Sequence, residues 1–157
     1  MDRYTNLSWV FRALREKQLE FNWLLTDLEC SPYPGRLAEY SDVDPKKNRL
    51  WLTGSDLTEL VDFNHIQFIW GVLSGFRPGI QPDLVHLDPY PISEGNKALW
   101  KPNVQIQHPL AEVEIVCYDS SATLLLTSTI DLALGFRAFF PEAIDLDNYN
   151  RARQSAA

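Results

Sequence analysis

The stretch HIQFIWGVL, residues 65–73, is the most apolar strand candidate of the chain and decides its fold. A short run this rich in β-branched and aromatic side chains predicts a strand at the centre of a sheet. Gly71 and Gly75 would weaken such a strand unless another group approaches its backbone closely at those positions. We therefore place this segment in the middle of a sheet and assign the other elements around it.

Three other regions have the pattern of strands. Residues 21–28 (FNWLLTDL) place alternate apolar side chains on one face, and residues 49–53 form a second short strand. Residues 112–118 and 122–127 are predicted to pair as a hairpin around the polar turn at 119–121.

Helical patterns occur between and around these strands. Residues 7–18 carry apolar side chains at helical spacing, with Ser8 as the expected N-cap. Asp56 and Glu59 have the spacing of a capping box at the start of a short helix, and residues 130–140 form another helix with an apolar stripe. Because helices and strands mix without regular alternation, the fold class is predicted to be α+β.

Residues 1–157 are predicted to form a single domain, which is the size that a chain of this length fits. The expected architecture is a mainly antiparallel β-sheet with an N-terminal and a C-terminal helix packed on it and a long Pro-rich loop. Residues 151–157 are expected to be a frayed tail.

The Pro-rich loop, residues 77–109, contains six of the ten prolines. Irregular segments of this length inside a compact domain are usually functional or disordered. Apolar side chains recur along this one, so it is expected to pack, either on its own domain or on a partner. Its charges balance, whereas the excess acid lies in residues 1–76 and 110–157. We interpret it as a shaped contact element beside an acidic body.

The charge of the chain argues against nucleic-acid binding. It has 21 acidic and 14 basic residues, a formal net charge of −7. Nucleic-acid binders usually show the opposite sign, because their affinity comes from neutralising phosphates, and the longest basic cluster here is KKNR at 46–49. No nucleic-acid partner is expected, and the acidity suits a protein partner with a basic cleft.

The expected location is the cytoplasm, with no membrane partner. The chain has no apolar run of about 18 residues, which a membrane span requires. Its first residues lack the apolar core of a signal peptide. Cys30 and Cys117, the two cysteines, are expected to be reduced and buried.

Sites for catalysis or metal binding have little support in the sequence. His86 and Asp88 would suit a metal in an extended segment, but a surface pair is the favoured interpretation. Ser74 is not part of a GxSxG elbow, Cys117 lies on the apolar face of a strand, and no phosphate-binding glycine motif occurs. We therefore expect no catalytic residue, no metal and no cofactor, and a protein that is not an enzyme.

Acidic and aromatic side chains point instead to binding. Glu112 and Glu114 share one face of a predicted strand, opposite the apolar stripe, and Asp119 follows in the turn. A solvated face is favoured over a catalytic pair, which needs a sheltered site. Trp100 and Tyr90 are candidate interface anchors, because Trp and Tyr dominate binding hot spots; the alternative is that they fold back and seal the sheet edge.

Four motifs carry a family resemblance: FNW at 21–23, LTGSDL at 52–57, QFIWGVLSGF at 67–76 and VCYDSSATLLL at 116–126. Followed by a Phe-rich helix, they resemble small bacterial proteins of polymorphic-toxin neighbourhoods. The resemblance implies a cytosolic immunity protein of a contact-dependent or type VI effector system. Such a protein binds its cognate toxin, blocks the active site and has no catalytic residues.

The function predicted from the sequence is that of an immunity protein that neutralises a cognate bacterial toxin through an acidic, aromatic-containing surface. Acidic side chains would steer it onto the toxin's basic active-site cleft. The expected partner-binding residues are Asp83, His86, Asp88, Tyr90, Glu94 and Trp100, with Glu112, Glu114 and Asp119 as a second choice.

Two alternatives stay open. In the first, residues 77–109 are the lid of a small enzyme or ligand-binding domain, with His86, Asp88 and Ser74 lining its pocket. In the second, the chain is a structural subunit that forms a homodimer or a larger homo-oligomer.

Overall fold

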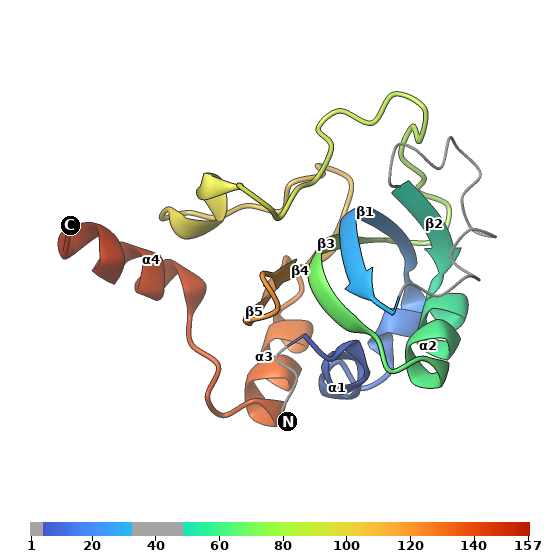
Figure 1. Ribbon diagram of the computed structural model, residues 1–157, viewed down its shortest axis with the longest axis horizontal. Helices are drawn as coiled ribbons and strands as arrows, with labels where there is room; N and C mark the ends of the chain where they lie inside the picture. Colours follow the sequence, from blue (N-terminus) through green and yellow to red (C-terminus); the bar gives the residue numbers. More distant parts are fainter. Residues whose placement is uncertain (1–4, 33–48) are drawn as a thin grey trace.

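A computed structural model describes residues 5–32 and 49–157 and contains one five-stranded antiparallel sheet (Figure 1). The strand order is β2-β1-β3-β4-β5, with each neighbouring pair antiparallel. The strands are β1 (Asn22–Ser31), β2 (Arg49–Thr53), β3 (Gln67–Phe76), β4 (Val113–Tyr118) and β5 (Ala122–Thr127). The apolar stretch that decides the fold forms most of β3, which begins two residues later than predicted and extends to Phe76, and it occupies the central position that the sequence predicts.

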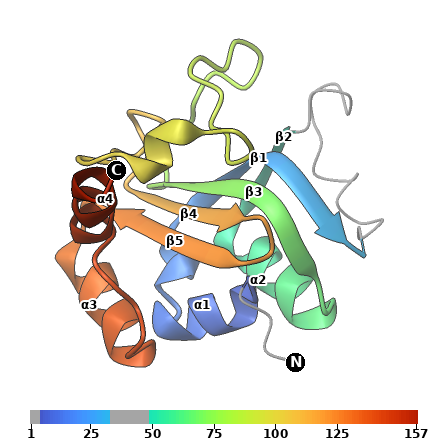
Figure 2. The same ribbon diagram turned by 60° about the vertical axis from the view of Figure 1, so that its left-hand side comes forward.

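Three helices cover one face of the sheet, and the Pro-rich segment, residues 77–109, covers the other (Figure 2). The helices are α1 (Leu7–Ala13), α2 (Gly54–Phe63) and α3 (Ile130–Phe139). The main core lies between these helices and the sheet, and its fully buried side chains include Trp23, Leu57, Phe68, Leu73 and Ile115. The predicted α+β class, with an N-terminal and a C-terminal helix packed on the sheet, is confirmed.

The helices begin at other residues than the sequence predicts. Asn6, not Ser8, caps α1, because the Asn6 side chain accepts a hydrogen bond of 3.1 Å from the Ser8 amide. In α2 the cap is Thr53, whose hydroxyl accepts a hydrogen bond of 3.1 Å from the Asp56 amide. The prediction of a capping box from Asp56 to Glu59 was therefore three residues too late.

A fourth helix, α4 (Leu146–Ser155), corrects the prediction of a frayed tail over 151–157. Residues 151–155 belong to this helix, which Asp145 caps through a hydrogen bond of 2.8 Å from the Asn148 amide. The helix is held by tertiary contacts: the buried Asn150 side chain donates to the carbonyls of Leu99 and Lys101, at 2.9 and 3.0 Å. These partners lie some 50 residues away, so local sequence patterns give no sign of them.

The Pro-rich segment packs on its own domain. It contains the 3-10 helix Lys97–Trp100 and no strand. Leu99 is buried against Val72 of β3 and Val116 of β4, which together make a second, smaller core. This contact answers the question that the sequence left open about where the segment packs.

Two details of the sheet agree with the sequence-based expectations: the close approach to the backbone at Gly75 and the tight turn of the β4–β5 hairpin. A side chain at Gly75 would place its Cβ 2.4 Å from Cγ1 of Val113, so a neighbouring strand does approach the backbone there. In the β4–β5 hairpin, Asp119 and Ser120 both have positive φ, of 48° and 54°, and the Ser121 amide donates to the Tyr118 carbonyl. This is the type I′ geometry that matches the twist of a hairpin.

Within residues 5–32 and 49–157, no helix combines the length and apolar character that crossing a membrane requires. The first three residues of the basic cluster, 46–48, lie outside the described part of the chain.

Candidate binding face

The Pro-rich segment is fixed to the sheet by hydrogen bonds to β1 and β3. The Thr26 hydroxyl donates to the Pro91 carbonyl at 2.7 Å. The Gly71 amide donates to the Ser93 hydroxyl at 3.0 Å, and this bond is buried. The segment therefore presents a fixed surface to solvent.

Asp27 organises this contact from a β-bulge. The register of β1 against β3 shifts between Thr26 and Glu29, and Asp27 has a positive φ of 52°. Its carboxylate accepts three hydrogen bonds: from the Ser93 amide at 2.7 Å, from the Ser93 hydroxyl at 3.0 Å and from the Glu94 amide at 2.9 Å. The bulge thereby holds the backbone of Glu94 against the sheet.

A row of aromatic rings runs from β3 to α4. Trp70 of β3 packs edge-on against Tyr118 of β4, with ring centroids 4.8 Å apart. Tyr118 in turn contacts Trp100 at 4.9 Å, and Trp100 lies 6.3 Å from Tyr149 of α4. The first three rings are only partly buried; Tyr118 and Trp100 pack on the second core, and all three rings still reach solvent.

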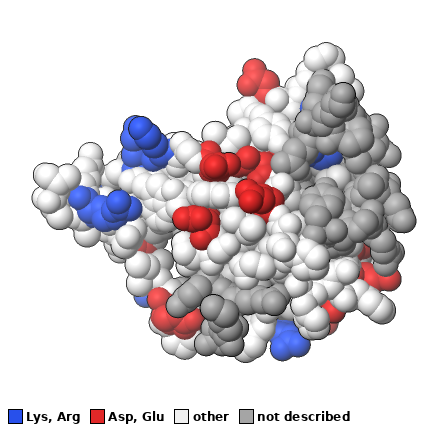
Figure 3. Space-filling view, in the orientation of Figure 1, with Lys and Arg blue, Asp and Glu red and all other residues white. Residues whose placement is uncertain are grey.

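Three exposed carboxylates lie around Trp70 and Tyr118. Glu29 is the strand partner of Trp70, and Glu94 follows Ser93, which is bonded to Gly71 beside that tryptophan. Asp119 follows Tyr118 directly. We call these acids and rings the acidic–aromatic face; its members are Glu29, Trp70, Glu94, Trp100, Tyr118 and Asp119. Figure 3 shows acidic side chains gathered in the middle of this side of the molecule, with basic ones toward α4.

The structure therefore brings together three of the residues that the sequence singled out: Glu94, Trp100 and Asp119. Trp100 combines the two alternatives considered for it, because it packs on Tyr118 and also remains partly exposed.

The other candidates of the Pro-rich segment lie outside this face, in its outer part, residues 83–90: Asp83, His86, Asp88 and Tyr90. The Asp83 carboxylate accepts from the amides of Val85 and His86, at 2.9 and 3.1 Å, and lies 3.2 Å from Nδ1 of the His86 ring. These hydrogen bonds, the His86 amide first, lower the pKa of Asp83. The half-buried Tyr90 hydroxyl accepts from the Asp27 amide at 2.8 Å, and burial raises its pKa.

Glu114 corrects the prediction of a solvated strand face. Its side chain is fully buried and accepts hydrogen bonds from the backbone and side-chain nitrogens of Gln107, at 2.9 and 3.1 Å. The cause is that the Pro-rich segment covers this face of β4, and burial raises the pKa of Glu114. Glu114 is thus unavailable to a partner.

Glu112, on the same strand face, stays partly exposed and forms an ion pair with Arg77 at 2.9 Å. Arg77 also pairs with Glu20 at 3.2 Å, and the hydrogen bond to Glu112 is the main cause of its raised pKa. Glu112 therefore serves to fix Arg77, the first residue of the Pro-rich segment.

The sequence patterns did not single out Asp27, Glu29, Trp70 or Tyr118 as binding residues. The alternation of β1 gave no sign of the bulge, which redirects the side chains after Thr26. A signal was present in Trp70 and Tyr118, because strands that carry large amphipathic rings have to cover them or expose them.

Groups for catalysis are sparse in the described part of the chain. Residues 5–32 and 49–157 hold no group of three His, Cys, Asp or Glu side chains that would bind a metal ion. Cys117 is buried and Cys30 half-buried; both thiols are free, and burial raises their pKa values to about 12 and about 11. Neither thiol is thus activated as a nucleophile at neutral pH.

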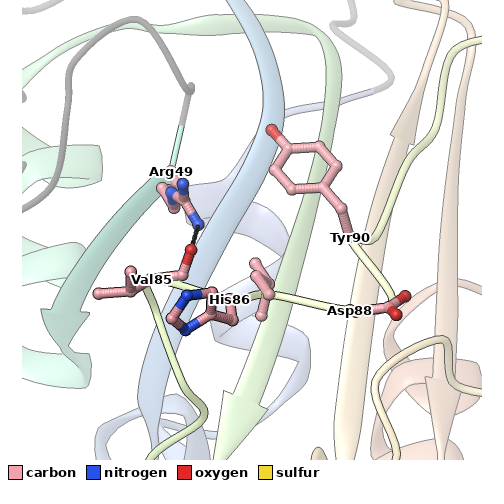
Figure 4. Close-up of a pocket in the computed structure, with 6 residues that line it drawn as sticks. Arg49, Val85, His86, Asp88 and Tyr90 are labelled. Atoms are coloured by element: carbon pink, nitrogen blue, oxygen red, sulfur yellow. Dashed lines mark hydrogen bonds between the residues drawn. The ribbon is translucent and has the colours of Figure 1, made fainter.

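A shallow hollow of about 440 Å³ lies beside the outer part of the Pro-rich segment, with Arg49, His86, Asp88 and Tyr90 among its lining residues (Figure 4). Ser74, which the lid alternative placed in such a pocket, is fully buried in β3 and does not line the hollow.

Comparison with protein-family models, curated proteins and solved structures gave no match. The fold and the geometry together define an α+β domain with a fixed, exposed acidic–aromatic face.

Proposed function

We propose that the protein binds a basic protein partner through the acidic–aromatic face, and that it acts as an immunity protein that neutralises a cognate toxin. The observation that carries the proposal is the arrangement of three exposed carboxylates, Glu29, Glu94 and Asp119, around the partly exposed rings of Trp70 and Tyr118. Aromatic anchors inside a charged rim are typical of protein–protein interfaces.

The two kinds of residue serve different steps of association. The acids, in a chain of net charge −7, raise the association rate with a basic surface. The rings lose their remaining contact with water in the complex, which slows dissociation. A stable interface buries on the order of 1,600 Å² in total, so the face would form the centre of a larger contact.

The test uses the product of the adjacent gene as the partner, in co-expression and in a binding assay with purified proteins. The variant E29Q/E94Q/D119N removes three charges from the face. Its matched control, E16Q/D131N/E142Q, removes three exposed charges elsewhere, so both change the net charge from −7 to −4.

We expect the first variant to slow association by at least about tenfold at low salt and the control by much less. Trp100→Ala is expected to act mainly on the dissociation rate. Equal effects of the two triple variants would refute the face as the contact surface. Failure of the wild type to form a complex or to protect from toxicity would refute the immunity function.

A further inference from the structure

Helix α3 has an apolar side that is exposed to solvent. Its ten residues, IDLALGFRAF, include only two charged ones, Asp131 and Arg137. Leu132 faces the main core and is 2% exposed, whereas Ile130 and Leu134 are 72% and 58% exposed. A helix at the surface is normally polar on its outer side, and one that is apolar on both sides is normally buried on both. The outer side of α3 therefore has the composition of a contact surface.

Five exposed residues form a stripe along this outer side, the α3 stripe: Ile130, Asp131, Leu134, Arg137 and Ala138. At 3.6 residues per turn they lie within about one third of the helix circumference, with Leu134 at the centre. Trp9 of α1, which is 52% exposed, packs edge-on against Phe139 with ring centroids 6.2 Å apart. The exposed apolar surface thus continues from the stripe onto α1.

The α3 stripe is complementary to itself when the same helix of a second copy packs antiparallel to it. If the two copies of Leu134 meet at the centre, the residue three positions before it opposes the residue three positions after it, and so on along the helix. Asp131 then lies opposite Arg137 of the second copy, and Ile130 lies opposite its Ala138. An opposite-charge pair and a large side chain against a small one each occur twice, as a two-fold axis requires.

The two charges favour the antiparallel orientation over the parallel one. In a parallel pair Asp131 would face Asp131 of the second copy, and Arg137 would face its Arg137, and such like-charge contacts are unfavourable. In the part of the chain that the structure describes, neither residue forms an ion pair, so both are available to a second copy. Exposed ion pairs add little affinity, so the charges set the orientation, and the burial of Ile130 and Leu134 drives association.

We infer that the protein forms a homodimer through the α3 stripe, with the two-fold axis passing at Leu134. Two helices of ten residues bury less than the standard interface of about 1,600 Å², so the dimer is weak, with a Kd on the order of 10–100 µM. Helix α3 and the Pro-rich segment cover opposite faces of the sheet (Figure 2), so the contact leaves Glu94 and Trp100 of the acidic–aromatic face accessible. The inference does not depend on the function proposed for that face.

The experiment is analytical ultracentrifugation of the purified full chain from about 5 µM to about 1 mM, a range that brackets this Kd. Leu134→Glu places a carboxylate of each copy at the axis and should raise the Kd at least about tenfold. The matched control is Phe63→Glu, which introduces the same charge at a residue of α2 that is 78% exposed, and it should leave the Kd unchanged. Because both positions are exposed, neither variant should disturb the fold.

Two charge reversals test the antiparallel register. Asp131→Arg alone and Arg137→Asp alone each place like charges opposite one another in both halves of the contact, so each should raise the Kd at least about tenfold. The double variant D131R/R137D exchanges the two charges and restores the pairing. Its Kd should return to within about threefold of the wild-type value.

A chain that remains monomeric at about 1 mM would overturn the inference. Equal weakening of the dimer by Leu134→Glu and Phe63→Glu, or no weakening by Leu134→Glu, would overturn it as well. If neither charge reversal weakened the dimer, or if D131R/R137D failed to restore it, the antiparallel contact at Leu134 would be wrong.

Discussion

Oδ2 of Asp27 lies 2.7 Å from the backbone nitrogen of Ser93, across 66 residues of sequence, and this contact anchors the Pro-rich segment to the sheet. The same oxygen accepts from the Ser93 hydroxyl and from the Glu94 amide. A bulge in β1 is therefore what positions one corner of the acidic–aromatic face.

Substitution of Asp27 is expected to loosen the Pro-rich segment. Asp27→Ala removes the acceptor of three hydrogen bonds and should lower the free energy of unfolding by about 2 kcal/mol. It should also speed proteolysis and amide exchange within residues 90–96. Asp27→Asn keeps one acceptor oxygen and tolerates the positive φ, so its loss should be smaller. Unchanged stability and unchanged protection of residues 90–96 in Asp27→Ala would show that the carboxylate is not the anchor.

Glu114 is expected to make stability fall as the pH rises. Burial raises its pKa in the folded state, so the folded protein binds more protons than the unfolded chain just above the ordinary value of 4.5. Stability is thus lost as the pH rises through that window. Glu114→Gln should remove this dependence in chemical denaturation between pH 4 and pH 7, whereas the exposed Glu142→Gln should retain it. If the stability of Glu114→Gln changed with pH in parallel with that of the wild type, the assignment to Glu114 would be contradicted.

His108 is expected to act in the opposite direction. Burial lowers its pKa from the ordinary 6.5; its ring lies 5.1 Å from that of Phe76, and its Nδ1 accepts from the Leu110 amide at 3.2 Å. As the pH falls, His108 is protonated in the unfolded chain before it is protonated in the folded protein. Stability is therefore lost as the pH falls below about 6.5. His108→Gln should flatten denaturation midpoints between pH 7.5 and pH 5. The exposed His86→Gln serves as control, and flattening in both variants would count against His108.

Asn150 is expected to hold α4 in place. Asn150→Ala leaves the carbonyls of Leu99 and Lys101 without their donor and should cost about 2 kcal/mol. Amide exchange in α4 should rise with it. Asn148→Ala, two residues earlier and exposed, should change the free energy of unfolding by no more than about 0.5 kcal/mol and leave the exchange of α4 unchanged. Protection of α4 that survives Asn150→Ala would show that other contacts hold the helix.

Gly75 is expected to tolerate no side chain. A Cβ there would lie 2.4 Å from Cγ1 of Val113 and 3.2 Å from the Trp23 ring, so Gly75→Ala should lower stability by about 1–3 kcal/mol. At Gly71 the nearest contact of a Cβ is the flexible end of Leu28, at 3.3 Å, and the loss should be smaller. Thermal or urea denaturation of the two variants measures the difference, and the reverse order would contradict this packing.

The secondary structure of the sheet was largely predictable because its signals are local. The hairpin predicted at 112–118 and 122–127 is β4 and β5 with one residue trimmed, since turn residues and alternation lie within a few positions of each other. The α4 helix was not predictable in the same way, because its tertiary anchor is a pair of carbonyls near Trp100.

The candidate site was predicted only in part, and Glu114 shows why. Alternation placed it correctly on the face opposite Val113, Ile115 and Cys117, but alternation does not say what covers that face. The same limit applied to Trp70, whose exposure depends on a bulge in another strand.

The sequence by itself determined the α+β class, the central strand at 65–73 and the Pro-rich character of residues 77–109. Each rests on composition or on a period of a few residues, which the chain carries before it folds. Only the tertiary structure decided that the Pro-rich segment closes over the second face of the sheet. That contact buries Glu114 and gathers Glu29, Glu94 and Asp119 around Trp70 and Tyr118. These groups are dozens of residues apart in sequence, and strand pairing together with the Asp27 bulge brings them to one surface.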